Sequence, residues 1–461
     1  MTSDLEALFG RAARAAAEHR DTVADRPVAP GTREEAWAAF DGELPEGHTP
    51  PEQVLDDLLA AADGALVGTV GPRYFGFVIG GASPASSAAD ILTTGWDQNG
   101  FNPVLSPAAE AAERAAGGWV KELLGLPDGA SVGFVTGAQA ANTVGLAVGR
   151  HRVLEEAGWD VERDGLLGAP RLRVVAGADR HATIDRSLRL LGLGTASVVP
   201  VDTDAQGALD VTGLAAALNI EGGPTIVCLQ AGNVNTGASD DFAAAIPMAR
   251  ERGAWVHVDG AFGLWAAASP RHAEQVRGVE QADSWSTDAH KWLNVPYDSG
   301  LAIVADAQAH GRTLAYTADY LAGSGRADFS LGDLVLDSSR RARGFAVWAA
   351  LRELGRSGVA DLVDRCCALA RRMADRLTDG GATIHNDVVL NQVLVGFGDL
   401  SRTDTVIEEV QRDGTCWLGG TTWHGQRLIR VSVSNWSTTE ADIDLSAAAI
   451  LAAARRTGAL G

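Results

Sequence analysis

Between residues 105 and 304 the sequence alternates between strand-like and helical segments, and this alternation constrains the fold more than any other feature. Short β-type runs at 131–137 (SVGFVTG), 172–177 (LRVVAG) and 225–232 (TIVCLQAG) are each followed by a stretch with helical spacing. Strands that alternate with helices predict a mostly parallel sheet covered by helices on both faces. Such sheets bind ligands at the carboxyl ends of their strands, so residues that follow the strands are candidates for function.

The segments on either side of this region have other patterns. Residues 1–72 combine helical spacing with proline-rich breaks, which predicts a helical arm that could serve in dimerisation. Residues 345–461 start with a strongly helical stretch and continue with β-type runs and further helices, which predicts an α+β domain. We therefore expect an arm at 1–72, a large α/β domain at 73–344 and a small C-terminal domain at 345–461.

The charge balance narrows the functional classes. Lysine and arginine number 38 against 59 aspartate and glutamate residues, for a formal charge of −21. Such acidity argues against binding to nucleic acid or to anionic membranes, which requires a basic surface. No apolar run reaches the length of a membrane span, and the charged first 20 residues lack the apolar core of a signal peptide. The four cysteines show no metal-ligand spacing, so we expect a cytoplasmic protein without a metal site.

Lysine is almost absent from the chain. Only Lys121 and Lys291 occur, and the other 36 basic residues are arginine. Arginine supplies positive charge, but its pKa above about 12 prevents it from supplying a neutral amine. Where the chain has lysine and not arginine, the lysine is therefore a candidate for amine chemistry. Lys121 lies in the amphipathic stretch WVKELLG and is expected on a solvated face, whereas Lys291, in STDAHKWLNVPYDSG, does not fit a helical face.

Four features follow predicted strands or open predicted helices. Asp259 ends the strand-like run AWVHVD, where it could also be a helix cap or part of a structural ion pair. Lys291 follows 32 residues later, directly after His290, and could also be a solvated charge. The run FVTGAQAAN at 134–142 ends a strand and starts a helix, which makes either a phosphate site or a plain turn. His181 follows the strand LRVVAG and could be either functional or a cap.

These features map to one edge of one predicted sheet. An amine, a carboxylate, a phosphate-type helix start and an imidazole are the parts that bind pyridoxal phosphate (PLP). The lysine would bind the cofactor covalently, the aspartate would keep the pyridine nitrogen protonated, and the helix start would hold the phosphate. The protonated ring can then accept electrons from a bond broken at the substrate α-carbon.

The chain resembles the group II PLP-dependent amino-acid decarboxylases, the family of aromatic-L-amino-acid and glutamate decarboxylases. The resemblance spans roughly residues 50–440, and its most specific signal is the ordered pair HVD and HKW. It also includes the motifs GPRYFGFV, SPAAEAAERAAGGWVKELLGLP, TGAQAAN, HATIDRS, AGNVNTGA, SRRARGFAVWAALRELG and RVSVSNWSTT. The resemblance implies the aspartate-aminotransferase-like α/β fold (fold type I), with a mostly parallel seven-stranded sheet, a smaller α+β domain and a helical N-terminal arm. It also implies a homodimer with active sites at the subunit interface.

The resemblance implies roles for individual residues. Lys291 corresponds to the lysine that binds PLP, Asp259 to the partner of the pyridine nitrogen, and His181 to the imidazole that stacks on the ring. The other implied cofactor positions are Ala261 against the ring, Asn233 near the cofactor, Ala138 and Gln139 in the phosphate-binding turn, and His290 and Asp288 beside the phosphate. The implied wall of the substrate pocket, part of which comes from the partner subunit, consists of Phe101, Tyr74, Phe75 and Phe77.

The segment 313–330, TLAYTADYLAGSGRADFS, corresponds to a family loop that closes over the bound substrate. Tyr320 aligns with the loop tyrosine that returns a proton to the α-carbon after CO2 leaves. Relatives with phenylalanine at this position tend to form aldehydes oxidatively. Tyr320 therefore favours simple decarboxylation and is expected to be catalytic together with Lys291, His181 and Asp259.

The sequence departs from the family pattern near the phosphate. Asp288 stands where aromatic decarboxylases usually have asparagine, Gln139 replaces a small hydroxyl residue, and Gly260 replaces alanine. Because a carboxylate repels a phosphate, we expect Asp288 to point away or to hydrogen-bond elsewhere.

The expected activity is decarboxylation of an L-amino acid to the amine and CO2. The aromatic pocket wall favours an aromatic or bulky apolar substrate, although the family also includes enzymes for acidic and diamino acids. Arg326, Arg343 and Arg430 cannot be placed from the sequence, so those substrates stay open. The alternatives are oxidative decarboxylation and deamination to an aldehyde, transamination, another PLP-dependent carbon–carbon lyase reaction, and a cofactor-binding protein without turnover.

Overall fold

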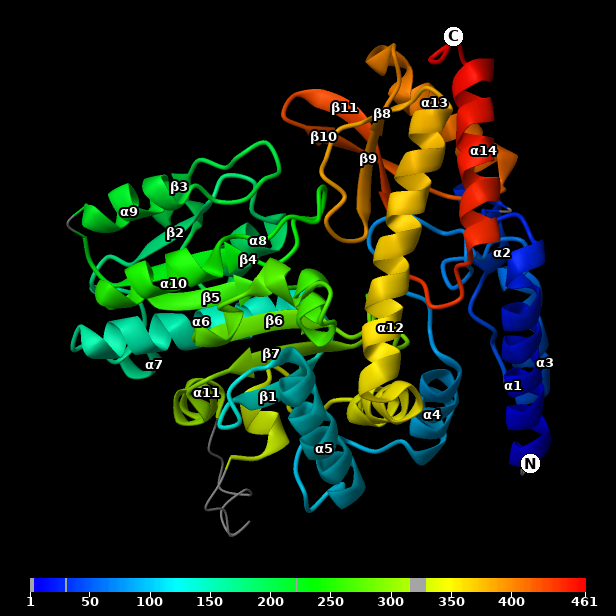
Figure 1. The fold of residues 1–461 in the computed structure, drawn as a ribbon. Helices are drawn as coiled ribbons and strands as arrows, with labels where there is room; N and C mark the ends of the chain where they lie inside the picture. Colours follow the sequence, from blue (N-terminus) through cyan, green and yellow to red (C-terminus); the bar gives the residue numbers. More distant parts are fainter. Residues whose placement is uncertain (1–3, 30, 221, 316–328) are drawn as a thin grey trace. The chain divides into compact units, whose positions relative to one another are not determined.

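The computed structural model describes residues 4–29, 31–220, 222–315 and 329–461 (Figure 1). The chain forms two compact units. The first comprises Met1–Gly81, Arg371–His385 and Val393–Gly461, and the second comprises Ala82–Ala370 and Asn386–Gln392. The residues discussed below as a candidate cofactor site all belong to the second unit.

A seven-stranded sheet with the order β1-β7-β6-β5-β4-β2-β3 forms the centre of the second unit. Strands β6, β5, β4, β2 and β3 are mutually parallel, and β7 runs antiparallel to both of its neighbours. The mostly parallel sheet expected from the alternating pattern is therefore confirmed. The strands are β1 (Ser131–Val135), β2 (Arg173–Gly177), β3 (Val198–Val201), β4 (Thr225–Gln230), β5 (Trp255–Asp259), β6 (Ser284–Asp288) and β7 (Gly300–Val304).

Helices cover both faces of this sheet. All six residues of β4 are buried, and successive side chains of a strand point to opposite faces, so neither face of β4 is open to water. Helix α6 packs against β4 to β7, α9 packs against β2 and β3, and α10 packs against β5. The helices are α4 (Pro84–Trp96), α5 (Pro107–Leu124), α6 (Ala138–Glu156), α7 (Val161–Asp164), α8 (Ala182–Leu190), α9 (Val211–Asn219), α10 (Phe242–Glu251) and α11 (Ala307–Leu314).

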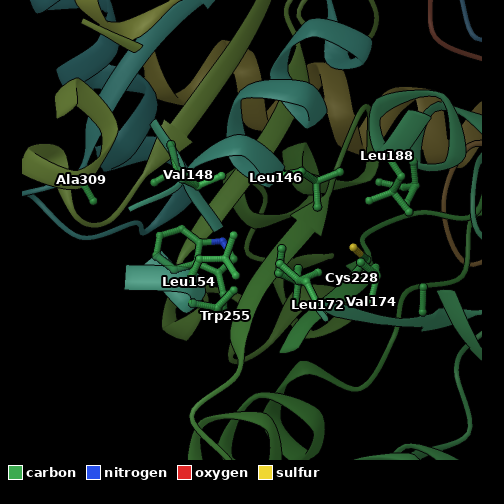
Figure 2. Close-up of a cluster of buried hydrophobic side chains, with 14 of the residues drawn as sticks. Leu146, Val148, Leu154, Leu172, Val174, Leu188, Cys228, Trp255 and Ala309 are labelled. Carbon is green, nitrogen blue, oxygen red and sulfur yellow. The ribbon is translucent and has the colours of Figure 1, made fainter. Parts of the chain in front are cut away.

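A cluster of buried apolar side chains anchors α6 and α8 to the sheet (Figure 2). Leu146 and Leu154 of α6 meet Leu188 of α8 and the strand residues Val174 and Cys228 in this cluster. Full burial of a large apolar side chain contributes about 1.5–3 kcal/mol relative to its exposure. This packing holds both helices on the sheet, and the first residues of both helices contribute to the candidate site.

The helices of the second unit begin in different ways. Asp210 and Asp241 cap α9 and α10 by accepting backbone N–H groups of the first turn, and His181 does the same for α8. Helix α6 differs, because its N-cap residue is Gly137, which has no side chain to accept a hydrogen bond. The first N–H groups of α6 therefore need acceptors from elsewhere.

The first unit combines helices with a four-stranded sheet of order β10-β11-β9-β8. The small additional sheet expected in the C-terminal part of the chain is present. The elements are α1 (Leu5–Thr22), α2 (Arg33–Phe40), α3 (Pro51–Ala62), β8 (Thr383–Ile384), β9 (Gln392–Gly396), α13 (Thr403–Asp413), β10 (Gly419–Trp423), β11 (Gln426–Ser432) and α14 (Glu440–Arg456). Helix α12 (Gly344–Asp379) contributes residues to both units and is kinked at Gly355, which has a φ of 60°.

Among the described residues, no helix has both the length and the apolar character needed to cross a bilayer. The same residues contain no group of three or more side chains placed to hold a metal ion. All four cysteines are described, and each is buried and free of disulfide bonds.

Candidate cofactor site

Two carboxylates end neighbouring parallel strands at the same edge of the sheet. Asp259 is the last residue of β5, and Asp288 is the last residue of β6. Ala261 connects the two residues, because its N–H donates to Asp259 Oδ1 (3.2 Å) and its carbonyl accepts from the backbone N–H of Asp288 (2.9 Å). Both carboxylates are nearly inaccessible to water, but their partners differ, and this difference defines the site.

The carboxylate of Asp259 is held by neutral donors. Besides the Ala261 N–H, its Oδ2 accepts from Asn142 Nδ2 (3.1 Å) and from Thr183 Oγ1 (3.4 Å). Among the described residues, no lysine, arginine or histidine lies within ion-pair distance of Asp259, although only 5% of the residue is exposed. Burying a negative charge without a cation is costly, so this position is suited to a cation that arrives with a ligand.

Asn142 connects Asp259 to a chain of buried polar side chains. Its Oδ1 accepts from His257 Nε2 (2.9 Å) and from Ser286 Oγ (2.6 Å). Since an amide oxygen can only accept, His257 carries its proton on Nε2, and its Nδ1 accepts from Ser284 Oγ (2.8 Å). Burial lowers the pKa of His257 to about 4, so the ring is neutral at physiological pH.

His181 is linked to Asp259 through one intervening side chain. Its Nδ1 lies 2.8 Å from Thr183 Oγ1, and the same hydroxyl contacts both Asn142 Nδ2 (3.1 Å) and Asp259 Oδ2 (3.4 Å). His181 and Asp259 also line one small hollow at the carboxyl ends of β2, β4 and β5. The structure therefore brings these two predicted residues together, and His181 is both a helix cap and part of the site.

Asp288 is paired with a lysine and lies beside a histidine, in contrast to Asp259. Its Oδ2 lies 3.0 Å from Lys291 Nζ, and its Oδ1 lies 3.5 Å from His290 Nε2. Oδ1 also accepts the N–H of Ala138, the first residue of α6, at 2.5 Å. Asp288 therefore does not turn away from the predicted phosphate turn but bonds to it directly. The physical reason is that α6 has no cap of its own, and a carboxylate is favourable at a helix N-terminus.

His290 is held in a fixed orientation next to this cluster. Its ring stacks on Tyr297 with 4.3 Å between centroids, and its Nδ1 accepts the N–H of Ser299 (3.1 Å). Burial lowers the pKa of His290, and the positive charge of Lys291 acts in the same direction, while Asp288 opposes them. The accepted hydrogen bond places the proton of the neutral ring on Nε2, which faces Asp288.

Two glycines let backbone segments meet at this turn. A Cβ on Gly300 of β7 would lie 2.4 Å from the Cα of Gly137, which no side chain could tolerate. A Cβ on Gly137 would come within 3.1 Å of His290 and 3.3 Å of Asp288. Gln139 extends its side chain away to α8, where its Nε2 donates to Ser187 Oγ (2.8 Å), so only its backbone is available to a ligand at the turn.

Asn233 uses its side chain to hold its own loop and to connect it to the segment after β2. Its Oδ1 accepts the N–H of Asn235 (2.8 Å), and its Nδ2 donates to the carbonyl of Asp179 (3.3 Å). The adjacent Ala231 N–H donates to the carbonyl of Asp259 (2.8 Å), which ties this loop to the end of β5.

The four predicted pocket-wall aromatics lie in different units. Phe101 belongs to the second unit, where it is buried and packs against Gly332. The other three belong to the first unit: Phe75 is fully buried, Tyr74 stacks on Trp417, and Phe77 is 63% exposed. Burial raises the pKa of Tyr74 to about 12. Tyr320 and Arg326 lie outside the described residues.

The sequence did not single out Asn142 and Thr183. Both lie inside motifs that carry the family resemblance, TGAQAAN and HATIDRS, but each is separated from Asp259 by many positions. Each is a polar side chain near the start of a predicted helix whose neighbouring residues are mostly small or apolar. This contrast is the sequence signal that could have identified them. Lys121 lies in the last turn of α5, is partly exposed, and donates from its Nζ to the carbonyls of Asp128 and Ala130 (2.5 and 2.8 Å).

The fold and the matched sequence domain define a PLP enzyme of fold type I. A family model described as the pyridoxal-dependent decarboxylase conserved domain matches residues 34–396. The chain thus belongs to the pyridoxal-dependent decarboxylase family.

Individual relatives span most of the chain. An aromatic-L-amino-acid decarboxylase of Bacillus atrophaeus is 27% identical over 418 residues, which cover 86% of this chain and 84% of that protein. A phenylacetaldehyde synthase of Arabidopsis thaliana is 28% identical over 323 residues, which cover 66% of this chain and 64% of that protein. The crystal structure of Oryza sativa TDC with PLP and tryptamine matches with a TM-score of 0.90 at 23% identity and covers 98% of both chains, which supports the fold.

The described residues fit PLP. Asp259 is a buried carboxylate with only neutral partners, as a protonated ring nitrogen requires. Lys291 supplies a primary amine that is 22% exposed. The start of α6 supplies backbone N–H groups, and Gly137 and Gly300 leave room for a close approach.

Proposed function

We propose that this protein decarboxylates an aromatic or bulky apolar L-amino acid to the corresponding amine and CO2, with Lys291 as the cofactor-binding lysine. The observation that carries this proposal is the contrast between two neighbouring carboxylates. Asp259 is buried among neutral donors, and Asp288 is paired with the amine of Lys291. Asp259 is suited to bind a cationic ring, and Asp288 holds the amine that we propose to react with the cofactor.

Asp259 would hold the proton on the ring nitrogen of the cofactor. Its three neutral donors fix the carboxylate without neutralising its charge, so its full negative charge remains available to a cationic partner. When bound, PLP supplies an electron sink that makes the bond between the substrate α-carbon and its carboxylate weak enough to break.

His181 would lie against the face of the ring and orient the reacting centre. Its position is supported by the link through Thr183 to Asp259, which ties the imidazole to the same cluster as the carboxylate. Because His181 also caps α8, the helix fixes the orientation of its ring.

The substrate class is supported by the relatives and by the aromatic residues assigned to the pocket. The Bacillus atrophaeus protein is named for aromatic L-amino acids. We therefore expect turnover with phenylalanine, tyrosine, tryptophan or their hydroxylated forms. Equal turnover of glutamate or a diamino acid in a matched panel would contradict this assignment.

The product is tested by measuring CO2, amine, aldehyde, ammonia and peroxide together. Simple decarboxylation gives equimolar amine and CO2, whereas the oxidative reaction gives aldehyde, ammonia and peroxide along with CO2. A relative named phenylacetaldehyde synthase makes the oxidative reaction the second candidate.

We propose that Tyr320 returns the proton to the α-carbon, so the amine should dominate. Aldehyde as the main product of the unaltered protein would contradict that role.

We propose in addition that the protein is a cytoplasmic homodimer. Its four cysteines are all free, as is usual in a reducing compartment. An apolar groove formed by α4, α5 and α12 includes Leu92 and Trp96, each about half exposed, and a second copy would cover it. Sedimentation of the purified protein should give twice the chain mass, and a monomer at micromolar concentration would contradict the proposal.

A further inference from the structure

We infer that Asp288 competes with the cofactor phosphate for the start of α6 and that its displacement releases Lys291. This inference rests on the proposed function. Its basis is that one carboxylate makes both contacts: Oδ1 accepts the Ala138 N–H (2.5 Å), and Oδ2 pairs with Lys291 Nζ (3.0 Å). The side chain of Asp288 is only 3% exposed, so these contacts are formed away from water.

The position that Asp288 takes is an anion site in its own right. Helix α6 is 19 residues long, and its N-cap Gly137 provides no side-chain acceptor. The positive end of the helix therefore attracts an anion, and the carboxylate that fills the position comes from β6, 150 residues further along the chain. A phosphate that uses the same N–H group has to replace this carboxylate.

Asp288 and a phosphate cannot share the site without a cost. Two negative groups a few ångströms apart in a buried environment repel each other strongly. Among the described residues, Lys291 is the cationic group paired with Asp288, because burial lowers the pKa of His290 and its Nδ1 accepts the N–H of Ser299. The amine of Lys291 already pairs with Asp288, so it cannot also neutralise a phosphate at the same turn. Entry of the phosphate therefore requires the carboxylate to leave the Ala138 N–H.

Displacement of Asp288 also changes the contacts of Lys291. While the ion pair is intact, Lys291 Nζ is held 3.0 Å from Asp288 Oδ2. When Asp288 leaves the turn, Lys291 loses this partner, and its amine can move toward the aldehyde of the cofactor. Binding of the phosphate and release of the amine are therefore coupled through one side chain.

A simpler account gives Asp288 only a structural role, namely to hold Lys291 in place. The two accounts differ for ligands that carry a phosphate but no aldehyde, because such ligands cannot react with Lys291. Pyridoxine 5′-phosphate and pyridoxine form a matched pair of this kind, and they differ only by the phosphate.

The test compares the affinities of these two probes for the cofactor-free full-length protein by equilibrium dialysis. Asp288→Asn keeps an oxygen that can accept the Ala138 N–H but removes the charge. Asp288→Glu keeps the charge, and Glu280→Gln removes one exposed negative charge from the same unit as a control. We expect the affinity ratio of pyridoxine 5′-phosphate to pyridoxine to rise at least tenfold in Asp288→Asn and to stay unchanged in Glu280→Gln.

An unchanged ratio in Asp288→Asn, with measurable binding of both probes, would overturn the inference. An equal rise in Asp288→Glu would also overturn it, because side-chain size would then be responsible. If Asp288→Asn does not fold, Asp288→Ser provides the same neutral comparison. Failure of the proposed function has another signature: the unaltered protein would form no covalent adduct with PLP on Lys291, whatever the ratio of the two probes.

Discussion

The network around Asn142 makes a quantitative prediction for the variant Asn142→Leu. Asn142 is fully buried and uses its amide in four hydrogen bonds, to His257, Ser286, Thr183 and Asp259. Leucine has a similar size but makes no hydrogen bonds. The Nε2–H of His257 and the Oδ2 of Asp259 then each lose a partner, while the hydroxyl of Ser286 can rotate.

The expected cost follows from the number of buried groups left without a partner. The Nε2–H of His257 is left without a partner, which costs about 1–3 kcal/mol, whereas Asp259 keeps Thr183 and Ala261 as donors. In domains of 150–250 residues each kcal/mol lowers the melting temperature by about 2–4 °C, so Asn142→Leu should lower it by a few degrees. The exposed Asn219→Leu serves as a control and should change stability by less than about 0.5 kcal/mol.

The variant Asn142→Asp tests the same network through its pH dependence. In the unaltered protein the pKa of His257 is about 4, below its ordinary value of 6.5, so the unfolded chain binds the extra proton first. The contribution of His257 to stability is therefore lost as the pH falls from about 6.5 to 4, by up to about 3 kcal/mol. A carboxylate at position 142 favours protonated His257 and raises its pKa.

Thermal unfolding at pH 7 and pH 5, followed by tryptophan fluorescence, measures both effects. The deficit of Asn142→Asp relative to the unaltered protein should shrink at the lower pH, and the deficit of Asn142→Leu should not. A melting temperature of Asn142→Leu within 1–2 °C of that of the unaltered protein would refute the reasoning. So would a deficit of Asn142→Asp that grows on acidification.

Three other substitutions give distinct readouts. Asp259→Asn removes the charge that would hold the ring proton, so CO2 release should slow at least a hundredfold; near-normal release would exclude that role. Glu113→Gln leaves Arg340 buried without its bidentate partner (2.7 Å for both bonds), which should cost about 3–5 kcal/mol in urea unfolding. Loss below 1 kcal/mol would show that the site admits water. Tyr320→Phe should shift the products from amine toward aldehyde by at least tenfold, and an unaltered product ratio would remove Tyr320 from the proton transfer.

The sheet could be predicted because local sequence patterns determine it. Strand-like runs that alternate with helical spacing indicate parallel strands, and β2, β3, β4 and β5 confirm this expectation. The antiparallel direction of β7 could not be predicted, since the apolar run LAIVAD has the same pattern in either direction. The direction of a strand depends on the path of the segment that connects it to the previous strand. The spacing of apolar residues within the strand carries no information about this path.

The edge of the site was predictable, but its hydrogen bonds were not. Asp259 and His181 were identified because they lie at the ends of predicted strands, and Asp288 was identified through the family resemblance. The structure places all three at the carboxyl edge of the sheet. The bond between Asp288 and Ala138 joins residues 150 positions apart, and the side chain of Gln139 turns to α8. Such contacts depend on register and rotamers, which a single sequence does not reveal.

The most direct test of the account is to locate the cofactor on the chain. The protein is incubated with PLP, reduced with borohydride and digested, and its peptides are analysed by mass spectrometry. Because the chain has only two lysines, Lys121 is an internal control for non-specific modification. The account predicts a reduced pyridoxyl-phosphate group on Lys291 alone, together with CO2 release that is lost in Lys291→Arg. An adduct on Lys121 without one on Lys291, or CO2 release that survives in Lys291→Arg, would contradict it.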